Sequence, residues 1–399
     1  MSPTVKTGSG AETLPLFPLQ EIGSLAKPVW RIQALSGKPV APAAFKEAES
    51  LVKELKIRDG GRLLELLKKQ GLEPKEKQEV KEFASALAIG WQEKVGLDIV
   101  YDGEQHRTEM YDYAVKHIQN FEPRGYVRSF DNRYYLKQAV VGPVKPTEFY
   151  HNEELKIIKK HATKPVKIPI TGAYTLMDWS FDEYYIGKVK QSGRRRREVL
   201  DEARRHFGID LAKNVLRPNI KALVDAGAHS IQIDEPAAIT RPDEMGLVVD
   251  TFNESVKGLK GRFTIHICFS DYRLMWPAVT KLENCAQFAL EYANKDSQEP
   301  GVADGERPGY ETIKLFKENK TDFEVGVGVL DVHTDNLETP ELVRDRILYA
   351  VKARGDPEKI FINPDCGLRT RTWDVSRTKM EIMARGTELA RKQLKVAKR

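Results

Sequence analysis

Short apolar runs alternate with longer amphipathic stretches along most of this chain, and that alternation is the strongest constraint on its fold. Each run is bounded by turn or polar residues and is mostly rich in Val, Ile, Leu or Phe, the pattern of buried parallel strands. The eight runs are Leu14–Leu19, Asp98–Tyr101, Val166–Ile170, Ser230–Ile233, Phe263–Cys268, Gln287–Leu290, Phe323–Leu330 and Ile360–Ile362. Helical patterns separate most of them, at Ala44–Leu55, Arg62–Lys69, Lys75–Val95, Arg196–Ala226, Pro242–Leu259, Arg273–Leu282, Tyr310–Glu318, Pro340–Ala353 and Ser376–Gln393.

This order of strands and helices predicts an α/β fold, namely a single (β/α)8 TIM barrel over residues 14–399. Residues 120–165 fit neither pattern and predict an inserted hairpin or extended excursion between strands 2 and 3. Residues 1–13 are small and polar, and predict a flexible lead-in. A six-stranded doubly wound sheet with an extra domain is the alternative, which the absence of a glycine-rich nucleotide loop after any strand disfavours.

Composition narrows the cellular setting and the partners. The 399 residues are 41% hydrophobic, enough for a large core, and the net charge is 64 − 58 = +6. We interpret the basic run Arg194–Arg197 and the basic C-terminus as solvated surface, so nucleic acid is not an expected partner. No apolar stretch is long enough for a signal core or a membrane span, and three cysteines are too few for a disulfide scaffold. These features predict a cytoplasmic protein.

Polar and reactive residues follow the predicted strands, at the end of a barrel where active sites lie. His266 and Cys268 are two positions apart on one strand, which puts both side chains on the same face. Cys366, at the end of the last strand, can reach the same point across the barrel. One imidazole, two thiolates and one further ligand form a tetrahedral zinc site, so the pattern predicts zinc. Cys285 has apolar neighbours and is assigned to the core.

Other strand ends offer groups for binding and proton transfer. His333 follows Asp331 by two positions and is a candidate proton donor or acceptor, or a histidine that only hydrogen-bonds the rim. Asp234 and Glu235 are adjacent on a strand, so only one of them faces the pocket. With Glu104 as a second carboxylate, the site suits a cationic amine better than a nucleotide. Trp179 offers a face for stacking or packs in the core.

These residues occur in stretches that resemble the C-terminal catalytic barrel of cobalamin-independent methionine synthase. The matching stretches are Ile22-Gly23-Ser24, Asp102-Gly103-Glu104, Asp178-Trp179-Ser180-Phe181, Ile231-Gln232-Ile233-Asp234-Glu235-Pro236-Ala237, His266-Ile267-Cys268, Asp331-Val332-His333 and Asn363-Pro364-Asp365-Cys366-Gly367-Leu368. They keep the family's order from near the N-terminus to near the end of the chain.

The resemblance implies a role for each matching residue. His266, Cys268 and Cys366 would be zinc ligands, with Glu291 as a fourth, displaceable ligand. The amino-acid end of homocysteine would be held by Ile22, Gly23, Ser24, Glu104 and Asp234. His333 would handle the proton, and Trp179 would line the face that binds the methyl donor.

The implied activity is zinc-dependent transfer of a methyl group to the thiol of homocysteine, which makes methionine. The chain resembles the short, single-barrel form of the family, so the donor is either a methyl-corrinoid (methylcobalamin, free or protein-bound) or a methyl-tetrahydropterin. Two other functions remain open: addition of zinc-bound coenzyme M to an epoxide in the same barrel family, and RNA binding by a structural zinc protein.

Overall fold

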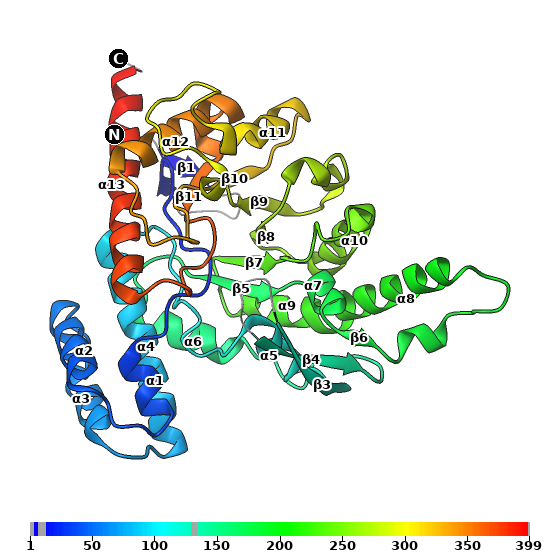
Figure 1. The fold of residues 1–399 in the computed structure, drawn as a ribbon, viewed down its shortest axis with the longest axis horizontal. Helices are drawn as coiled ribbons and strands as arrows, with labels where there is room; N and C mark the ends of the chain where they lie inside the picture. Colours follow the sequence, from blue (N-terminus) through cyan, green and yellow to red (C-terminus); the bar gives the residue numbers. More distant parts are fainter. Residues whose placement is uncertain (1–3, 7–12, 129–133, 398–399) are drawn as a thin grey trace.

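A parallel sheet of six strands forms the centre of the molecule in the computed structural model, which describes residues 4–6, 13–128 and 134–397 (Figure 1). Its strands lie in the order β11-β10-β9-β8-β7-β5. Their bounds are β5 Lys167–Thr171, β7 Ser230–Asp234, β8 Phe263–Ile267, β9 Cys285–Leu290, β10 Glu324–Gly328 and β11 Ile360–Asn363. Most of their residues are buried, as is typical of parallel strands, which confirms the α/β fold and six of the eight predicted strands.

The first two predicted strands are present as isolated parallel bridges that connect the two edges of this sheet. Leu19 pairs with Ile362 of β11, Gln20 pairs with Ile99, and Val100 pairs with Val166 beside β5. Pro18 has no backbone N–H to donate, which limits the ladder that this segment forms. The bridges nevertheless bring residues 19–20 and 99–100 into register with the central strands.

Helices pack around the sheet, and most of them match the predicted ranges. They are α1 Val29–Leu35, α2 Pro42–Glu54, α3 Gly60–Lys68, α4 Pro74–Val95, α5 Met110–Val115, α6 Asn152–His161, α7 Ala173–Asp178, α8 Arg196–Leu211, α9 Arg217–Asp225, α10 Met245–Val256, α11 Lys314–Glu318, α12 Pro340–Arg354 and α13 Trp373–Ala397. A π-helical segment, Ala212–Leu216, joins α8 to α9, so the long pattern Arg196–Ala226 is continuous helix. The short helices α1, α5, α6 and α7 were not predicted.

One predicted helix is wrong, and a second, Tyr310–Glu318, is α-helical only over α11, because Pro308–Ile313 is a 3₁₀ helix. The range Arg273–Leu282 contains two 3₁₀ helices, Tyr272–Met275 and Ala278–Lys281, in place of one α-helix. Pro277 lies between them, and its ring has no N–H for the helical ladder.

Helix ends are set by local signals. Helix α4 begins with a capping box between Glu73 and Glu76 and ends at Gly96, whose φ of 101° is left-handed. Helix α12 begins where the Thr339 hydroxyl accepts a hydrogen bond of 3.1 Å from the Leu342 amide, and it ends at Gly355.

The segment 120–165 contains an antiparallel hairpin, as predicted, followed by α6. Strands β3 (Phe121–Arg128) and β4 (Tyr134–Val140) pair with each other, and β4 also pairs with the short strand β6 (Phe181–Asp182). Most of the predicted lead-in, together with the tip of this hairpin, lies outside the described residues. Strand β1 (Thr4–Lys6) lies within the lead-in and pairs with β2 (Thr13–Pro15), which begins at its last residue.

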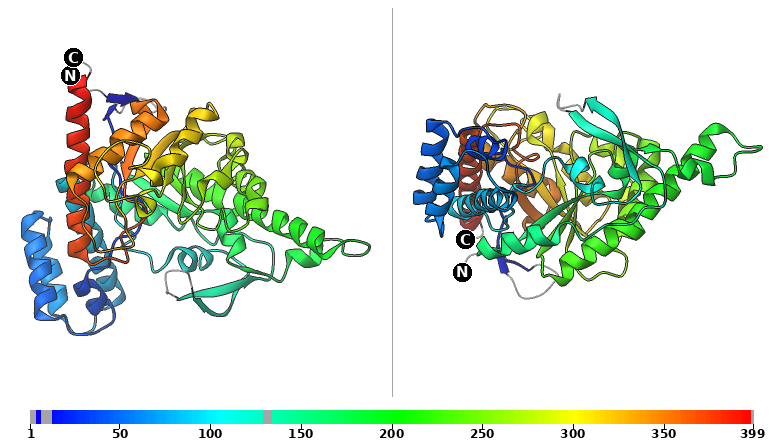
Figure 2. Two further views of the ribbon diagram at one scale, coloured as in Figure 1. Left: turned by 45° about the horizontal axis from the view of Figure 1, so that its top comes forward. Right: turned by 90° about the horizontal axis from the view of Figure 1, so that it is seen from below.

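The basic run Arg194–Arg197 lies mostly at the surface, as its charge predicts. Helix α8 and the loop before it project from the body of the molecule (Figure 2). The basic run spans the end of this loop and the start of α8, and it forms ion pairs: Arg194 with Glu202, Arg195 with Glu198, and Arg197 with Asp201. Among the described helices, none is both long and apolar enough to cross a membrane.

Candidate functional site

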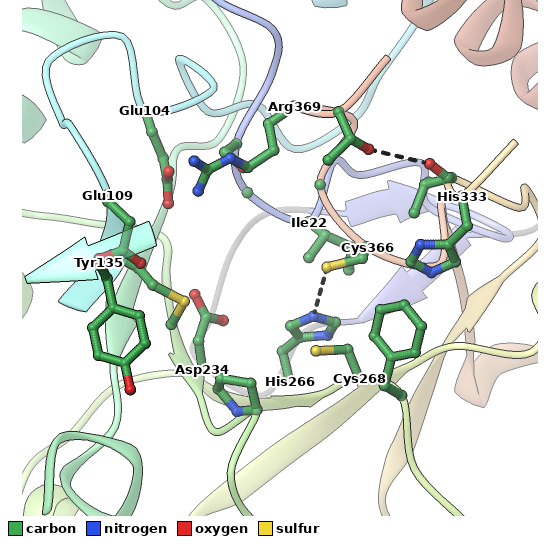
Figure 3. Close-up of a pocket in the computed structure, with 18 of the residues that line it drawn as sticks. Ile22, Glu104, Glu109, Tyr135, Asp234, His266, Cys268, His333, Cys366 and Arg369 are labelled. Carbon is green, nitrogen blue, oxygen red and sulfur yellow. Dashed lines mark hydrogen bonds between the residues drawn. The ribbon is translucent and has the colours of Figure 1, made fainter. Parts of the chain in front are cut away.

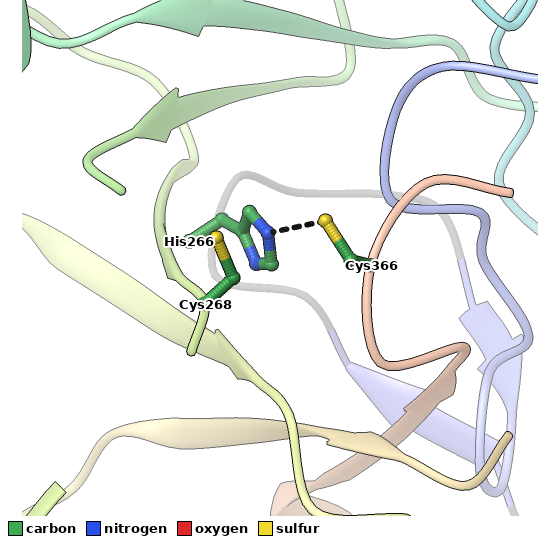
Figure 4. Close-up of side chains that lie close together, drawn as sticks. All are labelled: His266, Cys268 and Cys366. Carbon is green, nitrogen blue, oxygen red and sulfur yellow. Dashed lines mark hydrogen bonds between the residues drawn. The ribbon is translucent and has the colours of Figure 1, made fainter. Parts of the chain in front are cut away.

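Three side chains predicted to bind a metal converge at the carboxyl ends of the central strands. His266 lies near the end of β8, Cys268 just after it, and Cys366 three residues beyond β11. Their ligand atoms all lie within 4.8 Å of one another, and Cys366 Sγ is 3.6 Å from His266 Nε2 (Figure 4). Residues 100 positions apart in the chain therefore form one cluster.

The donor set fits a zinc ion. His266 Nδ1 donates a hydrogen bond of 2.9 Å to the Ala289 carbonyl, which leaves the lone pair of Nε2 facing the thiols. The neighbouring Cys268 and burial raise the pKa of the Cys366 thiol, although His266 opposes them. A divalent cation would relieve the repulsion between two adjacent thiolates, and one nitrogen and two sulfur ligands are a zinc-binding set.

Glu291 lies next to this cluster and is not part of it. Its carboxylate is fully buried, and Oε2 accepts hydrogen bonds from the Phe269 amide (3.0 Å) and the Asn294 side chain (2.9 Å). Oε1 has no hydrogen-bond partner and lies 3.7 Å from His333 Nε2. Burial opposes protonation of His333, but Glu291, with smaller contributions from Asp331 and Asp365, outweighs burial, so the pKa of His333 is raised.

A cavity of about 160 Å³ lies beside the cluster and has two chemically different sides (Figure 3). The imidazole and thiols lie on one side, and the carboxylates of Glu104, Glu109 and Asp234 lie on the other. The cavity also includes the predicted residues Ile22, Gly23, Ser24, Trp179 and His333. Every predicted site residue except Glu291 therefore lines one pocket.

Only the first of the adjacent acids Asp234 and Glu235 faces this pocket, as strand alternation predicts. Asp234 ends β7, and burial raises the pKa of its carboxyl to about 6. Glu235 points the other way and accepts hydrogen bonds from the Tyr174 and Thr175 amides (3.1 and 2.8 Å) at the start of α7. Glu235 is therefore a helix-capping residue.

The loops that carry Glu104 and Ser24 depend on two glycines. Gly103 has φ of 68°, and a Cβ there would lie 2.6 Å from the Leu25 side chain. A Cβ on Gly367 would lie 2.7 Å from the Ser24 carbonyl oxygen. A side chain at either glycine would therefore collide with the loop that carries Ser24 and Leu25.

Trp179 lies where the hairpin meets the pocket. Its ring stacks on Tyr135 of β4 at 5.4 Å with an interplanar angle of 27°, and Tyr111 packs against it at 6.3 Å. Trp179 and Tyr135 both line the cavity.

Sequence reasoning missed several residues of the pocket. Arg369 is the one arginine or lysine among the described residues that line it, and Phe269, Glu109 and Tyr135 also contribute. Arg369 directly follows the stretch Asn363–Leu368, so its place next to that motif was an available signal. Phe269 directly follows the stretch His266-Ile267-Cys268 and carried the same signal. Glu109 belongs to no recognisable motif, and its position depends on loop conformation.

Several known proteins are similar to this chain in sequence and in fold. A family model described as the catalytic domain of cobalamin-independent synthase matches residues 61–389. A methionine synthase of Thermoplasma volcanium is 40% identical over 297 residues, covering 73% of this chain and 83% of that protein. A methionine synthase of Thermococcus kodakarensis is 32% identical over 382 residues, covering 96% of this chain and 95% of that protein.

A solved structure of a B12-independent methionine synthase from Shewanella sp. W3-18-1, in complex with selenomethionine, matches with a TM-score of 0.72 at 26% identity. The match covers 96% of this chain and 99% of that one. The family model and these relatives show that the chain belongs to the cobalamin-independent methionine synthase family.

Proposed function

We propose that this protein is a zinc-dependent methyltransferase that converts homocysteine to methionine. The observation that carries the proposal is the pocket with two sides, which places Asp234 and Glu104 opposite His266, Cys268 and Cys366. Homocysteine has an ammonium group at one end and a thiol at the other, and so matches both sides. Family membership and the similar methionine synthases support the same substrate.

His266, Cys268 and Cys366 would hold the zinc ion, and Glu291 would be the exchangeable fourth ligand. A bound zinc ion lowers the pKa of a coordinated thiol and keeps it nucleophilic at neutral pH. Asp234 and Glu104 would bind the substrate ammonium, and Ser24 with the backbone of Ile22 and Gly23 would bind its carboxylate. These contacts aim the substrate sulfur at the donor methyl group, where an S–C bond forms as the donor's bond to methyl breaks.

The donor is a methyl-corrinoid or a methyl-tetrahydropterin, and Trp179 with Tyr135 offers a flat face for either ring system. A pterin nitrogen must be protonated to leave, and His333 would supply or relay that proton. A corrinoid leaves as reduced cobalt and takes no proton.

Coenzyme M alkylation is the second candidate, and Arg369 is the observation in its favour because it could bind a sulfonate. Three carboxylates in the same pocket oppose an anionic substrate. Calorimetric titration with homocysteine and with coenzyme M decides between them, and tighter binding of coenzyme M would overturn the present proposal.

We further infer that the eight predicted strands close into a (β/α)8 barrel and that residues 14–399 form one catalytic unit. The isolated bridges at Leu19, Gln20 and Val100 support this closure because they connect β11 to β5.

The direct test is methionine formation from homocysteine with methylcobalamin and with methyl-tetrahydrofolate, assayed side by side. Zinc content is measured on the same sample. We expect about one zinc per chain and methionine with at least one donor. A zinc-loaded, folded protein that forms no methionine with either donor contradicts the proposal.

A further inference from the structure

A buried chain of hydrogen bonds runs beneath the substrate pocket and involves residues that the proposed reaction does not use. Lys167, at the start of β5, reaches Gln232 of β7, where its Nζ donates a hydrogen bond of 2.8 Å to Oε1. Gln232 Nε2 then donates to Asp234 Oδ1 at 2.7 Å and to the Ile22 carbonyl at 2.8 Å. Lys167 and Gln232 are 1% and 0% exposed, so water does not compete for these contacts.

The chemistry of its neighbours determines the orientation of the Gln232 amide. An ammonium group can only donate, and a carboxylate and a carbonyl oxygen can only accept. Lys167 therefore holds the amide oxygen on its own side, and both amide hydrogens are directed to Asp234 and Ile22. Burial lowers the pKa of Lys167 to about 8, so its side chain still carries the third proton at neutral pH.

Gln232 thus joins the two parts of the pocket that would bind the two ends of an amino acid. Asp234 faces the substrate ammonium, and Ile22 begins the loop that would hold the substrate carboxylate. One side chain contacts both at less than 3 Å. This buried amide therefore links the two binding points directly.

We propose that Gln232, oriented by Lys167, is a positioning residue that sets the spacing between the ammonium and carboxylate sites and so selects an α-amino-acid thiol. This inference rests on the proposed function. Neither side chain lines the cavity, so both act through Asp234 and Ile22.

The test compares three thiols: homocysteine, 4-mercaptobutanoate, which lacks the ammonium, and 3-mercaptopropylamine, which lacks the carboxylate. In Gln232→Leu, kcat/KM for homocysteine should fall about 10- to 100-fold, mainly through KM, because charge-assisted contacts are lost. The smaller thiols each use one binding point, so their kcat/KM should fall much less. Lys167→Met should act in the same direction and add nothing to Gln232→Leu in the double variant.

Gln287→Leu is the matched control, because Gln287 is a buried strand glutamine that bonds to Gln20 at 2.9 Å, away from Asp234. It should keep the wild-type preference for homocysteine. If Gln232→Leu does not fold, Gln232→Glu replaces it, since a carboxylate keeps the shape and the contact with Lys167 but cannot donate to Asp234 or Ile22.

The possible outcomes separate the two proposals. An equal loss on all three thiols, or additive effects of Lys167→Met and Gln232→Leu, overturns the positioning role while wild-type activity on homocysteine upholds the function. A wild-type protein that does not methylate homocysteine overturns the proposed function itself.

Discussion

At the scale of single residues, the three cysteines differ in their positions: two line the pocket, and the third packs against the core. Cys366 lies in the cluster with His266 and Cys268, whereas Cys285 begins β9 and packs against the core. Burial raises the pKa of Cys285 to about 12, so it remains a neutral thiol. Cys366 differs from Cys285 in having His266 and Cys268 as neighbours, so burial alone does not determine the chemistry of a cysteine in this protein.

This contrast leads to a prediction about metal content. Cys366→Ala should reduce bound zinc by at least tenfold at a limiting zinc concentration, because a three-ligand site loses one thiolate. Cys285→Ala is the control and should retain a full zinc complement. Atomic absorption of both proteins after dialysis is the measurement, and equal zinc in both would refute the assignment.

The role proposed for His333 leads to a prediction that differs between the two donors. It lies 3.7 Å from Glu291 at the edge of the pocket, in contact with Phe269 at a ring distance of 4.2 Å. His333→Gln should reduce turnover about 100-fold or more with a methyl-tetrahydropterin donor, since a positioned general acid is lost. With methylcobalamin the loss should be much smaller. Unchanged turnover on both donors would remove His333 from the mechanism.

At the scale of elements, the hairpin β3–β4 contributes one wall of the pocket. Tyr135 of β4 stacks on Trp179 and lines the cavity, whereas Tyr126 of β3 is 72% exposed. The side chains of one hairpin therefore divide between pocket and solvent.

Tyr135→Ala should raise KM for the methyl donor up to about tenfold, because an aromatic pair contributes about 0.5–1.5 kcal/mol beyond its buried area. KM for homocysteine should change little, since Tyr135 is on the Trp179 side. Tyr126→Ala provides the comparison and should behave as wild type in the same steady-state assay. A larger effect on homocysteine than on the donor would show that the hairpin does not form the donor face.

At the scale of the whole molecule, stability should depend on pH through a buried histidine. His151 is 2% exposed and lies 3.1 Å from Arg107 and 2.9 Å from Glu154. Burial and the Arg107 cation lower the pKa of His151 from 6.5 to about 4. At this residue the unfolded chain therefore takes up a proton first as pH falls below about 6.5, and the contribution of His151 to stability is lost from there down to about pH 4. Buried carboxyls with a raised pKa, such as Glu21 (about 8) and Glu235 (about 7), contribute with the opposite sign.

The loss from His151 is on the order of 3 kcal/mol over this window, at 1.36 kcal/mol per pKa unit. Denaturant unfolding between pH 7 and 5 measures about 2 kcal/mol of this loss, the part between pH 6.5 and 5, before protonation of unfolded carboxylates dominates. His151→Gln should remove this loss, so the free energy of unfolding at pH 5 relative to pH 7 should be higher than in the wild type, whereas replacing the exposed His206 by Gln should give the wild-type difference. The same slope in all three proteins would contradict this assignment.

The pattern of residues along the chain was sufficient to predict the parallel strands and most of the long helices. Strand alternation also placed His266 and Cys268 on one face and turned Glu235 away from the pocket. These properties depend on contacts between near neighbours in sequence, where a periodicity of two or of about 3.6 residues determines which side is buried. Pro277 broke one helical pattern because a single missing N–H outweighs a favourable period.

Only the tertiary structure decided which distant groups meet. It placed Arg369 in the pocket, left Glu291 beside the cysteines rather than among them, and packed Tyr135 on Trp179. It also connected Lys167 to Gln232, 65 residues away, and Gln232 to Ile22, 210 residues away. Such contacts depend on the register between strands and on loop conformation, which no local periodicity specifies. The sequence therefore predicted many of the residues that line the pocket, while the distances between them and the remaining residues of the lining were decided by the tertiary structure.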